Sequence, residues 1–271
     1  MIKQAIIPLA GLGTRLLPLT SVFAKELLPI NGKPGLEYIL DECIEAGIKE
    51  VIFIISKKKM MIKKYFYNDK FYRDIIKKKN DPNIINEYKK ILKYKKMIKF
   101  VFQDKPLGTG DAVYKTKKFI TDKYFLMLLP DDLIIKKNCS MSMITVHKKF
   151  KASVMASMKV NKNDVSRWGI YNIKKKIDKD NFIMNNVVEK PSIKNSPSNN
   201  AVIGRYILPK TIFSKLKSLK AGKGGEFHIT DAIQALIEDK HKFIGHNFSG
   251  KYLDCGTMKG YIKSTLEISK Q

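Results

Sequence analysis

Arginine is scarce in this 271-residue chain, although the formal net charge is +27. Of the 52 basic residues only four are arginines, so the other 48 are lysines. A surface that grips phosphate backbones or base edges usually relies on the planar guanidinium fork, which a lysine surplus does not supply. A chain rich in lysine, isoleucine and asparagine is typical of an AT-rich genome. We therefore expect no nucleic-acid partner and treat most of the charge as background.

Cysteine and histidine are also rare. The three cysteines, Cys43, Cys139 and Cys255, lie far apart and form no CxxC motif, so a disulfide framework is not indicated. The four histidines form no HExxH motif and no cluster with cysteine, which argues against a zinc site. We expect the cysteines to be buried thiols in a reducing compartment.

Long hydrophobic runs are missing. No apolar run is long enough to span a bilayer, and the N-terminal sequence is interrupted at Pro8 and Gly11, too early for the core of a signal peptide. Because 44% of the residues are hydrophobic, the chain can bury a substantial core, and disorder is disfavoured. We expect a soluble, cytoplasmic protein with no membrane partner.

Short β-rich apolar runs alternate with helical patterns in the first half of the chain, which predicts parallel strands joined by helices. Later runs are richer in strands. The expected strands are Gln4–Leu9, Val51–Ile55, Ile98–Phe102, Phe125–Leu129, Ser153–Lys159, Gly169–Ile173, Phe182–Val188 and Ala201–Leu208. The expected helices are Leu36–Ala46, Thr109–Phe119, Pro209–Leu216, Thr230–Glu238 and Met258–Ile268.

A lysine-rich stretch, Ser56–Lys96, predicts two or three amphipathic helices inserted between strands. Its aromatic residues Tyr65, Phe66, Phe71 and Tyr72 are at helical spacing. They could stack on nucleic-acid bases, but we favour a packed apolar face with a solvated basic face opposite.

A glycine-rich loop, Leu9–Arg15 (LAGLGTR), directly follows the first expected strand. Closely spaced glycines let backbone N–H groups approach an anion, and ligands of open α/β sheets bind at the carboxyl ends of strands. The loop lacks both the GxGxxG fingerprint, because position 16 is leucine, and the P-loop pattern. Its terminal arginine suits a triphosphate, since a guanidinium can bridge two phosphoryl oxygens. An ordinary tight turn is the alternative.

Further short segments follow this loop, and their order and spacing match a pattern that extends over residues 4–268. They are Ala24–Ile30 (AKELLPI), Gly32–Pro34 (GKP), Gln103 with Leu107–Val113 (LGTGDAV), Leu129–Asp132 (LPDD), Val165–Ile170 (VSRWGI), Val188–Pro191 (VEKP), Ile203–Tyr206 (IGRY), Gly225–Asp231 (GEFHITD) and Tyr252–Thr257 (YLDCGT). Their order closely resembles the signature of nucleotidyltransferases that make nucleotide sugars. Glu26 after Lys25 resembles the bacterial UTP–glucose-1-phosphate uridylyltransferase branch. Ala24 and Trp168 depart from the family's proline and tyrosine.

The resemblance implies an α/β fold of the Rossmann-like nucleotidyltransferase type, a three-layer α/β/α sandwich with a mixed, mainly parallel central sheet. It implies a single domain over residues 1–271. Residues 1–135 would form the nucleotide-binding half, with the helical insertion 56–96, and residues 136–271 the sugar-binding and oligomerisation half. The chain would form a homo-oligomer, a dimer or a tetramer, and the insertion is a candidate interface.

The implied reaction joins UTP and α-D-glucose 1-phosphate into UDP-glucose and pyrophosphate, with Mg²⁺ as cofactor. The sugar phosphate is already an anion, so no general base is needed, and catalysis would rest on positioning and charge neutralisation. One alternative is a relative that uses dTTP, CTP or another sugar 1-phosphate, because an amide does not distinguish uracil from thymine. A catalytically inactive basic binding protein is the other, and the intact phosphate and metal positions disfavour it.

The roles implied by the family motifs fall into four groups. The catalytic residues would be Arg15, Lys25, Asp131 and Lys190. The nucleotide would be bound by Ala10, Gly11, Gly13, Thr14, Glu26, Gln103 and Gly108. The sugar would be bound by Gly169, Glu189 and Gly204, and Mg²⁺ by Asp131 and Asp254. Arg205 is expected to join Arg15, Lys25 and Lys190 where positive charge meets phosphate.

Overall fold

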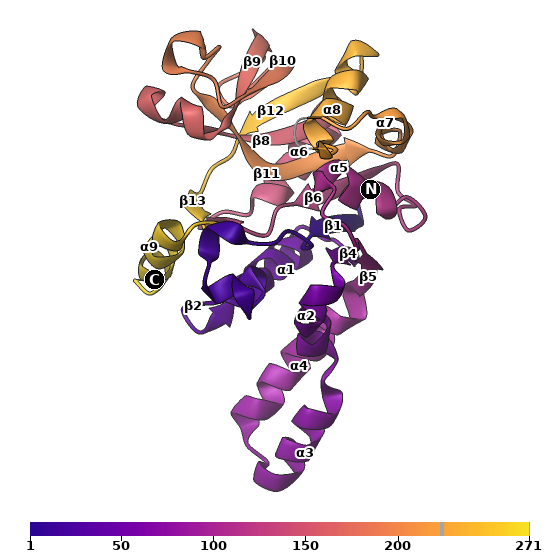
Figure 1. Cartoon of the computed structure of the whole chain (residues 1–271), viewed down its shortest axis with the longest axis vertical. Coiled ribbons are helices and arrows are strands. Elements are labelled where there is room, and N and C mark those ends of the chain that lie inside the picture. The colour runs from indigo at the N-terminus through magenta and orange to yellow at the C-terminus, as the bar shows by residue number, and fades with distance from the viewer. Residues whose placement is uncertain (223–224, 271) are drawn as a thin grey trace.

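The computed structural model describes residues 1–222 and 225–270, and Figure 1 shows the arrangement of the chain. Its strands are β1 (Gln4–Pro8), β2 (Pro29–Ile30), β3 (Lys33–Pro34), β4 (Glu50–Ile55), β5 (Ile98–Phe102), β6 (Tyr124–Leu128), β7 (Asp132–Ile135), β8 (Ser153–Lys159), β9 (Gly169–Lys176), β10 (Asn181–Glu189), β11 (Asn200–Pro209), β12 (Phe243–Asn247) and β13 (Lys251–Asp254). Its α-helices are α1 (Gly35–Glu45), α2 (Met60–Tyr67), α3 (Asp69–Lys79), α4 (Pro82–Met97), α5 (Gly108–Lys115), α6 (Cys139–Phe150), α7 (Ile212–Ser218), α8 (Ile229–Glu238) and α9 (Met258–Ile268).

One large mixed sheet runs through the part of the chain that the structure describes, in the order β5-β4-β1-β6-β11-β8-β12-β10-β9. Strands β5, β4, β1 and β6 pair in parallel, as expected from the alternating strands and helices of the first half. Strand β11 then runs antiparallel to both β6 and β8, and β10 runs antiparallel to β12 and β9. Strand β12 also pairs in parallel with β8, so the described sheet is mixed, as predicted, with four parallel and five antiparallel pairings.

Helices cover both faces of this sheet because consecutive side chains of a strand point to opposite sides. In β1, Ala5 and Ile7 belong to a core shared with α1, α2, α4 and α6. Ile6, between them, belongs to the core on the other face, which α5, α7 and α8 cover. The three-layer sandwich is confirmed.

Most predicted elements are present within a few residues of their expected bounds, and β5, β8 and α9 match them. The sequence patterns did not predict β2, β3, β7, α6, β12 and β13. Strand β12 is short and reads as apolar for only three residues, and α6 has a weak apolar periodicity, so neither gives a strong local signal. All three cysteines are buried, as expected.

The lysine-rich insertion forms α2, α3 and α4, which extend away from the sheet as a helical arm (Figure 1). Its base joins the core through Phe66 and Tyr94, whereas α3 has no buried residue. The packed-face interpretation of the aromatics is confirmed for Phe66, but Phe71 is exposed. Among the described residues, no helix combines the length and apolar character needed to cross a bilayer.

A two-stranded antiparallel sheet of β7 and β13 brings the end of the chain back to its middle. Its register pairs Leu253 with Leu133 and Asp254 with Asp132. The backbone N–H of Cys255 then donates to the carbonyl of Asp131 at 2.8 Å. This small sheet places two carboxylate segments, more than a hundred residues apart in sequence, beside one another.

Candidate active site

A cavity of about 540 Å³ opens at the carboxyl ends of β1 and β6. Its walls come from the glycine-rich loop, the segment after β5, the turn after β6 and the segment before α8. Of the residues expected at the site, the lining includes Ala10, Gly11, Gly13, Thr14, Lys25, Glu26, Gln103, Gly108 and Asp131. Every residue expected to bind the nucleotide therefore lies on one cavity, as does Asp131, whereas Arg15 and the second expected metal ligand, Asp254, are not part of its lining.

Two glycines of the first loop meet different constraints. Gly13 has a φ of +70°, in the left-handed region, and the Thr20 hydroxyl donates to its carbonyl at 2.8 Å. A side chain there would be strained and would lie 3.1 Å from the Thr20 side chain. A Cβ at Gly11, by contrast, would meet no atom of the described residues within 4 Å. Gly11 thus leaves an open approach to the backbone, as an anion-binding loop requires.

Two cations converge on one carboxylate at the cavity wall. Lys25 Nζ lies 2.8 Å from Asp131 Oδ2, and Arg15 Nη2 lies 3.3 Å from the same oxygen. Burial by itself would raise the pKa of Asp131, but the neighbouring Lys25 and Arg15 hold it below its ordinary value. Asp131 is therefore ionised at neutral pH, and its charge is balanced by Lys25 and Arg15.

Asp254 lies on the other side of the same small space. An ideal Cβ at Gly256 would lie 2.7 Å from Asp131 Oδ2, 2.8 Å from Arg15 Nη2 and 3.2 Å from Asp254 Oδ1. Both carboxylates thus flank the point that Gly256 keeps open. No group of three or more His, Cys, Asp or Glu side chains suited to a metal gathers within residues 1–222 and 225–270. Asp131 lines the cavity and Asp254 lies close to it across Gly256. This donor set fits Mg²⁺, which takes one or two carboxylates and completes its shell with phosphate and water.

Gln103 is fixed in orientation at the floor of the cavity. It is 4% exposed, and its amide nitrogen donates to Asp111 Oδ2 at 2.7 Å and to the Gly108 carbonyl at 3.2 Å. The amide oxygen is then the group left to accept a hydrogen bond from a ligand. Asp111, which motif reasoning quoted without a role, sets this orientation.

Residue 108 must be glycine because of its backbone conformation and because a neighbouring segment packs against it. Gly108 has a φ of +93°, and a Cβ there would lie 2.6 Å from the Phe227 carbonyl oxygen. The segment before α8 closes over this position, and its Glu226 and His228 line the cavity. Sequence reasoning gave these two residues no role, because a single sequence does not show which loop folds over which.

Glu26 forms a buried ion pair that the sequence did not predict. Both of its carboxylate oxygens accept from Lys59 Nζ, at 2.7 and 2.8 Å, and the two residues are 3% and 8% exposed. Burial lowers the pKa of the Lys59 ammonium, while Glu26 opposes that shift. Lys59 is the last of three consecutive lysines, a pattern that predicts solvent-exposed side chains. Only the tertiary structure distinguishes it from its neighbours.

Two of the residues expected to bind the sugar, Gly169 at the start of β9 and Glu189 at the end of β10, lie side by side, whereas Gly204 lies within β11. Gly169 pairs with Glu189 across the strands, and a Cβ at Gly169 would lie 3.1 Å from Glu189 Oε2. The Glu189 and Lys190 side chains are about two-thirds exposed and lie 3.7 Å apart. A smaller cavity of about 190 Å³, beside Glu189, lies between β10 and α8.

Gly204 and Arg205 make contacts within the protein that the motifs did not predict. A Cβ at Gly204 would lie 2.5 Å from both Asp132 Oδ2 and Leu129 Cβ, so glycine is required there by the close approach of the turn after β6. The Arg205 side chain is fully buried and ion-paired with Glu42. The expectation that Arg205 meets a substrate phosphate is therefore wrong, because its guanidinium is enclosed in the core.

Comparison with known proteins identifies the family to which this chain belongs. A family model described as nucleotidyl transferase matches residues 4–271. The chain belongs to the nucleotidyl transferase family. It is 35% identical to the UTP–glucose-1-phosphate uridylyltransferase of Bacillus subtilis, covering 100% of this chain and 92% of that protein. The protein of the same name from Mycoplasma pneumoniae is 34% identical, over 98% of this chain and 91% of the relative.

Solved structures of this family have the same fold. The UTP-bound UGPase of Acinetobacter baumannii superimposes with a TM-score of 0.89 at 31% identity, over 99% of this chain and 93% of that chain. A UDP-glucose pyrophosphorylase complexed with UDP-glucose gives 0.87 at 32% identity, over 100% and 99%. The superposition with these two structures extends over nearly the whole of this nucleotidyl transferase chain.

Proposed function

We propose that this nucleotidyl transferase makes UDP-glucose and pyrophosphate from UTP and α-D-glucose 1-phosphate. The observation that carries the proposal is the cavity that joins the glycine loop, Gln103 and the Lys25–Asp131–Arg15 cluster. Relatives about 34–35% identical over nearly their full length carry this activity in their names. The fold, the cavity and the relatives point to the same substrates.

The reaction is an in-line displacement at the α-phosphorus of UTP. A phosphate oxygen of glucose 1-phosphate attacks, a P–O bond forms, and the bond to the β-phosphate breaks as its electrons leave with pyrophosphate. Gln103 would accept the N3–H of uracil, and the backbone of the glycine loop would bind the phosphates. Lys25 and Arg15 would neutralise the charge that moves onto the leaving group, and Arg15, whose side chain is 64% exposed, is free to follow it.

Asp131 and Asp254 would hold Mg²⁺, which when bound supplies charge neutralisation and a fixed geometry for the α-phosphate and the attacking oxygen. In the structure Lys25 and Arg15 balance the charge of Asp131. These cations and the ion would share that carboxylate when substrates bind.

The sugar would be bound at Gly169, Glu189 and Lys190. Glu189 would accept two adjacent hydroxyls of glucose, Lys190 would face its phosphate, and Gly169 would let the ring approach the backbone. Gly204 would contribute mainly because its missing side chain lets the turn that carries Asp131 pack closely against β11. A homo-oligomer, dimer or tetramer, stays a prediction from the family resemblance.

The deciding experiment is pyrophosphate release by the purified protein with UTP, glucose 1-phosphate and Mg²⁺, with EDTA as the control. We expect release that depends on all three components, and preference for UTP over dTTP, CTP and ATP. Lys25→Ala and Asp131→Ala should each lower kcat by orders of magnitude while the circular dichroism spectrum stays unchanged. Salt-sensitive DNA binding without pyrophosphate release would instead support an inactive basic binding protein.

A further inference from the structure

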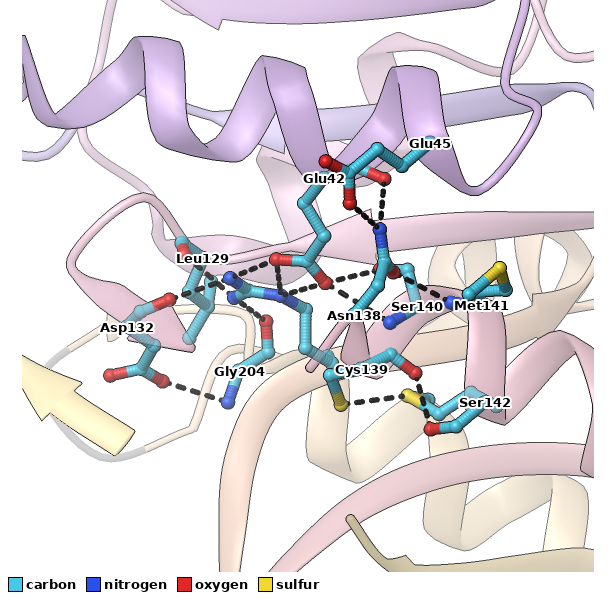
Figure 2. A network of polar contacts seen from close by, with 12 residues as sticks. Glu42, Glu45, Leu129, Asp132, Asn138, Cys139, Ser140, Met141, Ser142 and Gly204 are labelled. Carbon is cyan, nitrogen blue, oxygen red and sulfur yellow. Dashed lines mark hydrogen bonds and ion pairs between the residues drawn. The ribbon is translucent and has the colours of Figure 1, made fainter. Parts of the chain in front are cut away.

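Arg205 in β11 is enclosed by groups that it binds. Its Nε donates to both carboxylate oxygens of Glu42 at 3.1 Å, and its Nη2 donates to Glu42 Oε2 at 2.8 Å. Glu42, on α1, is held in turn by Ser140, whose backbone N–H and hydroxyl both donate to Oε1. Figure 2 shows Glu42 between Ser140 and the turn that contains Leu129 and Asp132. The guanidinium is therefore anchored from α1 and α6.

The other donors of Arg205 reach the turn that carries Asp131. Nη1 donates to the Leu129 carbonyl at 3.2 Å, and Nη2 donates to the Asp132 carbonyl at 2.6 Å. These two carbonyls flank Pro130 and Asp131. One planar group thus spans the turn, which is possible because guanidinium has five donors in a rigid fork.

The rest of the turn is fixed by neighbouring groups. The backbone N–H of Gly204 donates to Asp132 Oδ2 at 2.7 Å, and the Tyr252 hydroxyl donates to Oδ1 at 2.7 Å. The Cys255 N–H donates to the Asp131 carbonyl at 2.8 Å. The Asp131 side chain leaves this frame and points to Lys25 at the cavity wall.

We propose that Arg205, held by Glu42, is a positioning residue that fixes the Asp131 carboxylate for phosphoryl transfer without touching substrate. The inference rests on the proposed function. A buried ion pair adds little net stability, because desolvation of both charges offsets their attraction. A buried arginine that ties two carbonyls around one reacting carboxylate is better explained by the geometry it imposes. Small displacements of such a group cost large factors in rate.

The test variant is Arg205→Lys, which keeps a positive charge for Glu42 but cannot span both carbonyls with one nitrogen. We expect kcat to fall at least tenfold at a temperature where the variant is fully folded, with the KM for UTP changed less than threefold. The folded fraction is measured by thermal unfolding. Glu42→Gln is the second variant, which leaves Arg205 in place but weakens its anchor, and should change kcat in the same direction.

A readout independent of turnover is Mn²⁺ binding, which is measured by electron paramagnetic resonance. Sugar phosphate is left out, and the titration is done once with UTP and once without it. We expect the Mn²⁺ dissociation constant to rise at least fivefold in Arg205→Lys. The control is Tyr65→Phe, which removes a 2.5 Å hydrogen bond between α2 and the buried Glu37 of α1, in which no residue of the turn takes part. It should lower the unfolding temperature while kcat and Mn²⁺ affinity stay unchanged.

The outcomes separate the two proposals. A wild-type protein that releases no pyrophosphate refutes the proposed function, whereas the Mn²⁺ titration still reports the geometry of Asp131. A folded Arg205→Lys variant with normal kcat and normal Mn²⁺ affinity refutes the positioning role. The positioning role is also refuted if the activity of the variant falls only in proportion to its folded fraction. If Arg205→Lys does not fold, the same measurements on Glu42→Gln decide.

Discussion

Replacement of Glu26 by glutamine should destabilise this protein far more than the loss of one surface charge. The substitution keeps the shape of the side chain but leaves the Lys59 ammonium, 8% exposed, without its counter-ion. At an effective dielectric constant of about 20, unit charges 2.7 Å apart attract by about 6 kcal/mol, which is a gross value before desolvation. Removal of one partner of such a buried pair typically costs about 3–5 kcal/mol.

Unfolding in urea, followed by circular dichroism, measures this cost for Glu26→Gln, Lys59→Met and the double variant. Each single variant should lose about 3–5 kcal/mol, and the double variant should lose less than the sum because it leaves no unpaired charge. The exposed pair Lys57–Asp104, with side chains 81% and 63% exposed at 3.9 Å, is the matched control. Asp104→Asn should cost at most about 1 kcal/mol.

The pH dependence of Glu26→Gln provides a second check. Burial already lowers the pKa of Lys59, and loss of Glu26 removes the group that opposes this shift. The unfolded state then binds more protons than the folded state at alkaline pH, so stability rises as pH increases toward the ordinary lysine pKa. The deficit of the variant should therefore shrink between pH 7 and pH 9.5. A deficit under about 1 kcal/mol, or strictly additive single and double variants, would refute the argument.

Three further predictions concern other parts of the molecule. Gly256→Ala should abolish most activity with little loss of folded protein, because its Cβ would lie 2.7 Å from Asp131 Oδ2 at the proposed metal site; near-normal pyrophosphate release would contradict this. Burial lowers the pKa of His246, so the unfolded state takes up protons first and stability is lost as pH falls from 7 toward 5. The urea midpoint of His246→Gln should fall less over this range than that of the wild type, and equal slopes would show that His246 does not contribute. Gly108→Ala should raise the KM for UTP and lower stability, because its Cβ would lie 2.6 Å from a backbone oxygen; unchanged values for both would exclude that clash.

Local sequence patterns predicted much of this fold because the information lies within a few residues. After Glu50, the residues of β4 are all apolar and buried, and α9 begins after an N-cap at Thr257. The glycine-rich loop was expected at the end of the first strand, and Gly13 does adopt a left-handed conformation there. Elements with weak periodicity, such as α6, gave no comparable signal and were missed.

The sequence predicted which residues belong to the candidate site, but not which atoms they contact. The motifs named the residues that line the cavity, including Gln103 and Asp131, because their order along the chain resembles a known family. They assigned Arg205 to substrate phosphate, although the structure buries it against Glu42. Whether a cation faces a ligand or the core depends on which strand lies beside it, and that is set by sheet order rather than by neighbours in sequence.

The sequence by itself determined the class of fold, the glycine loop at the end of β1, the family and the identity of the groups that can bind a nucleotide sugar. It also showed that most of the +27 charge is lysine without an assigned site. The tertiary structure alone decided which charges are paired. The register of β7 and β13 brings Asp254 beside the Asp131–Asp132 turn, and the packing of the helical insertion places Lys59 on Glu26. These contacts join segments distant in sequence, so they exist only after the chain has closed its long-range strand pairings and excluded water from the charges between them.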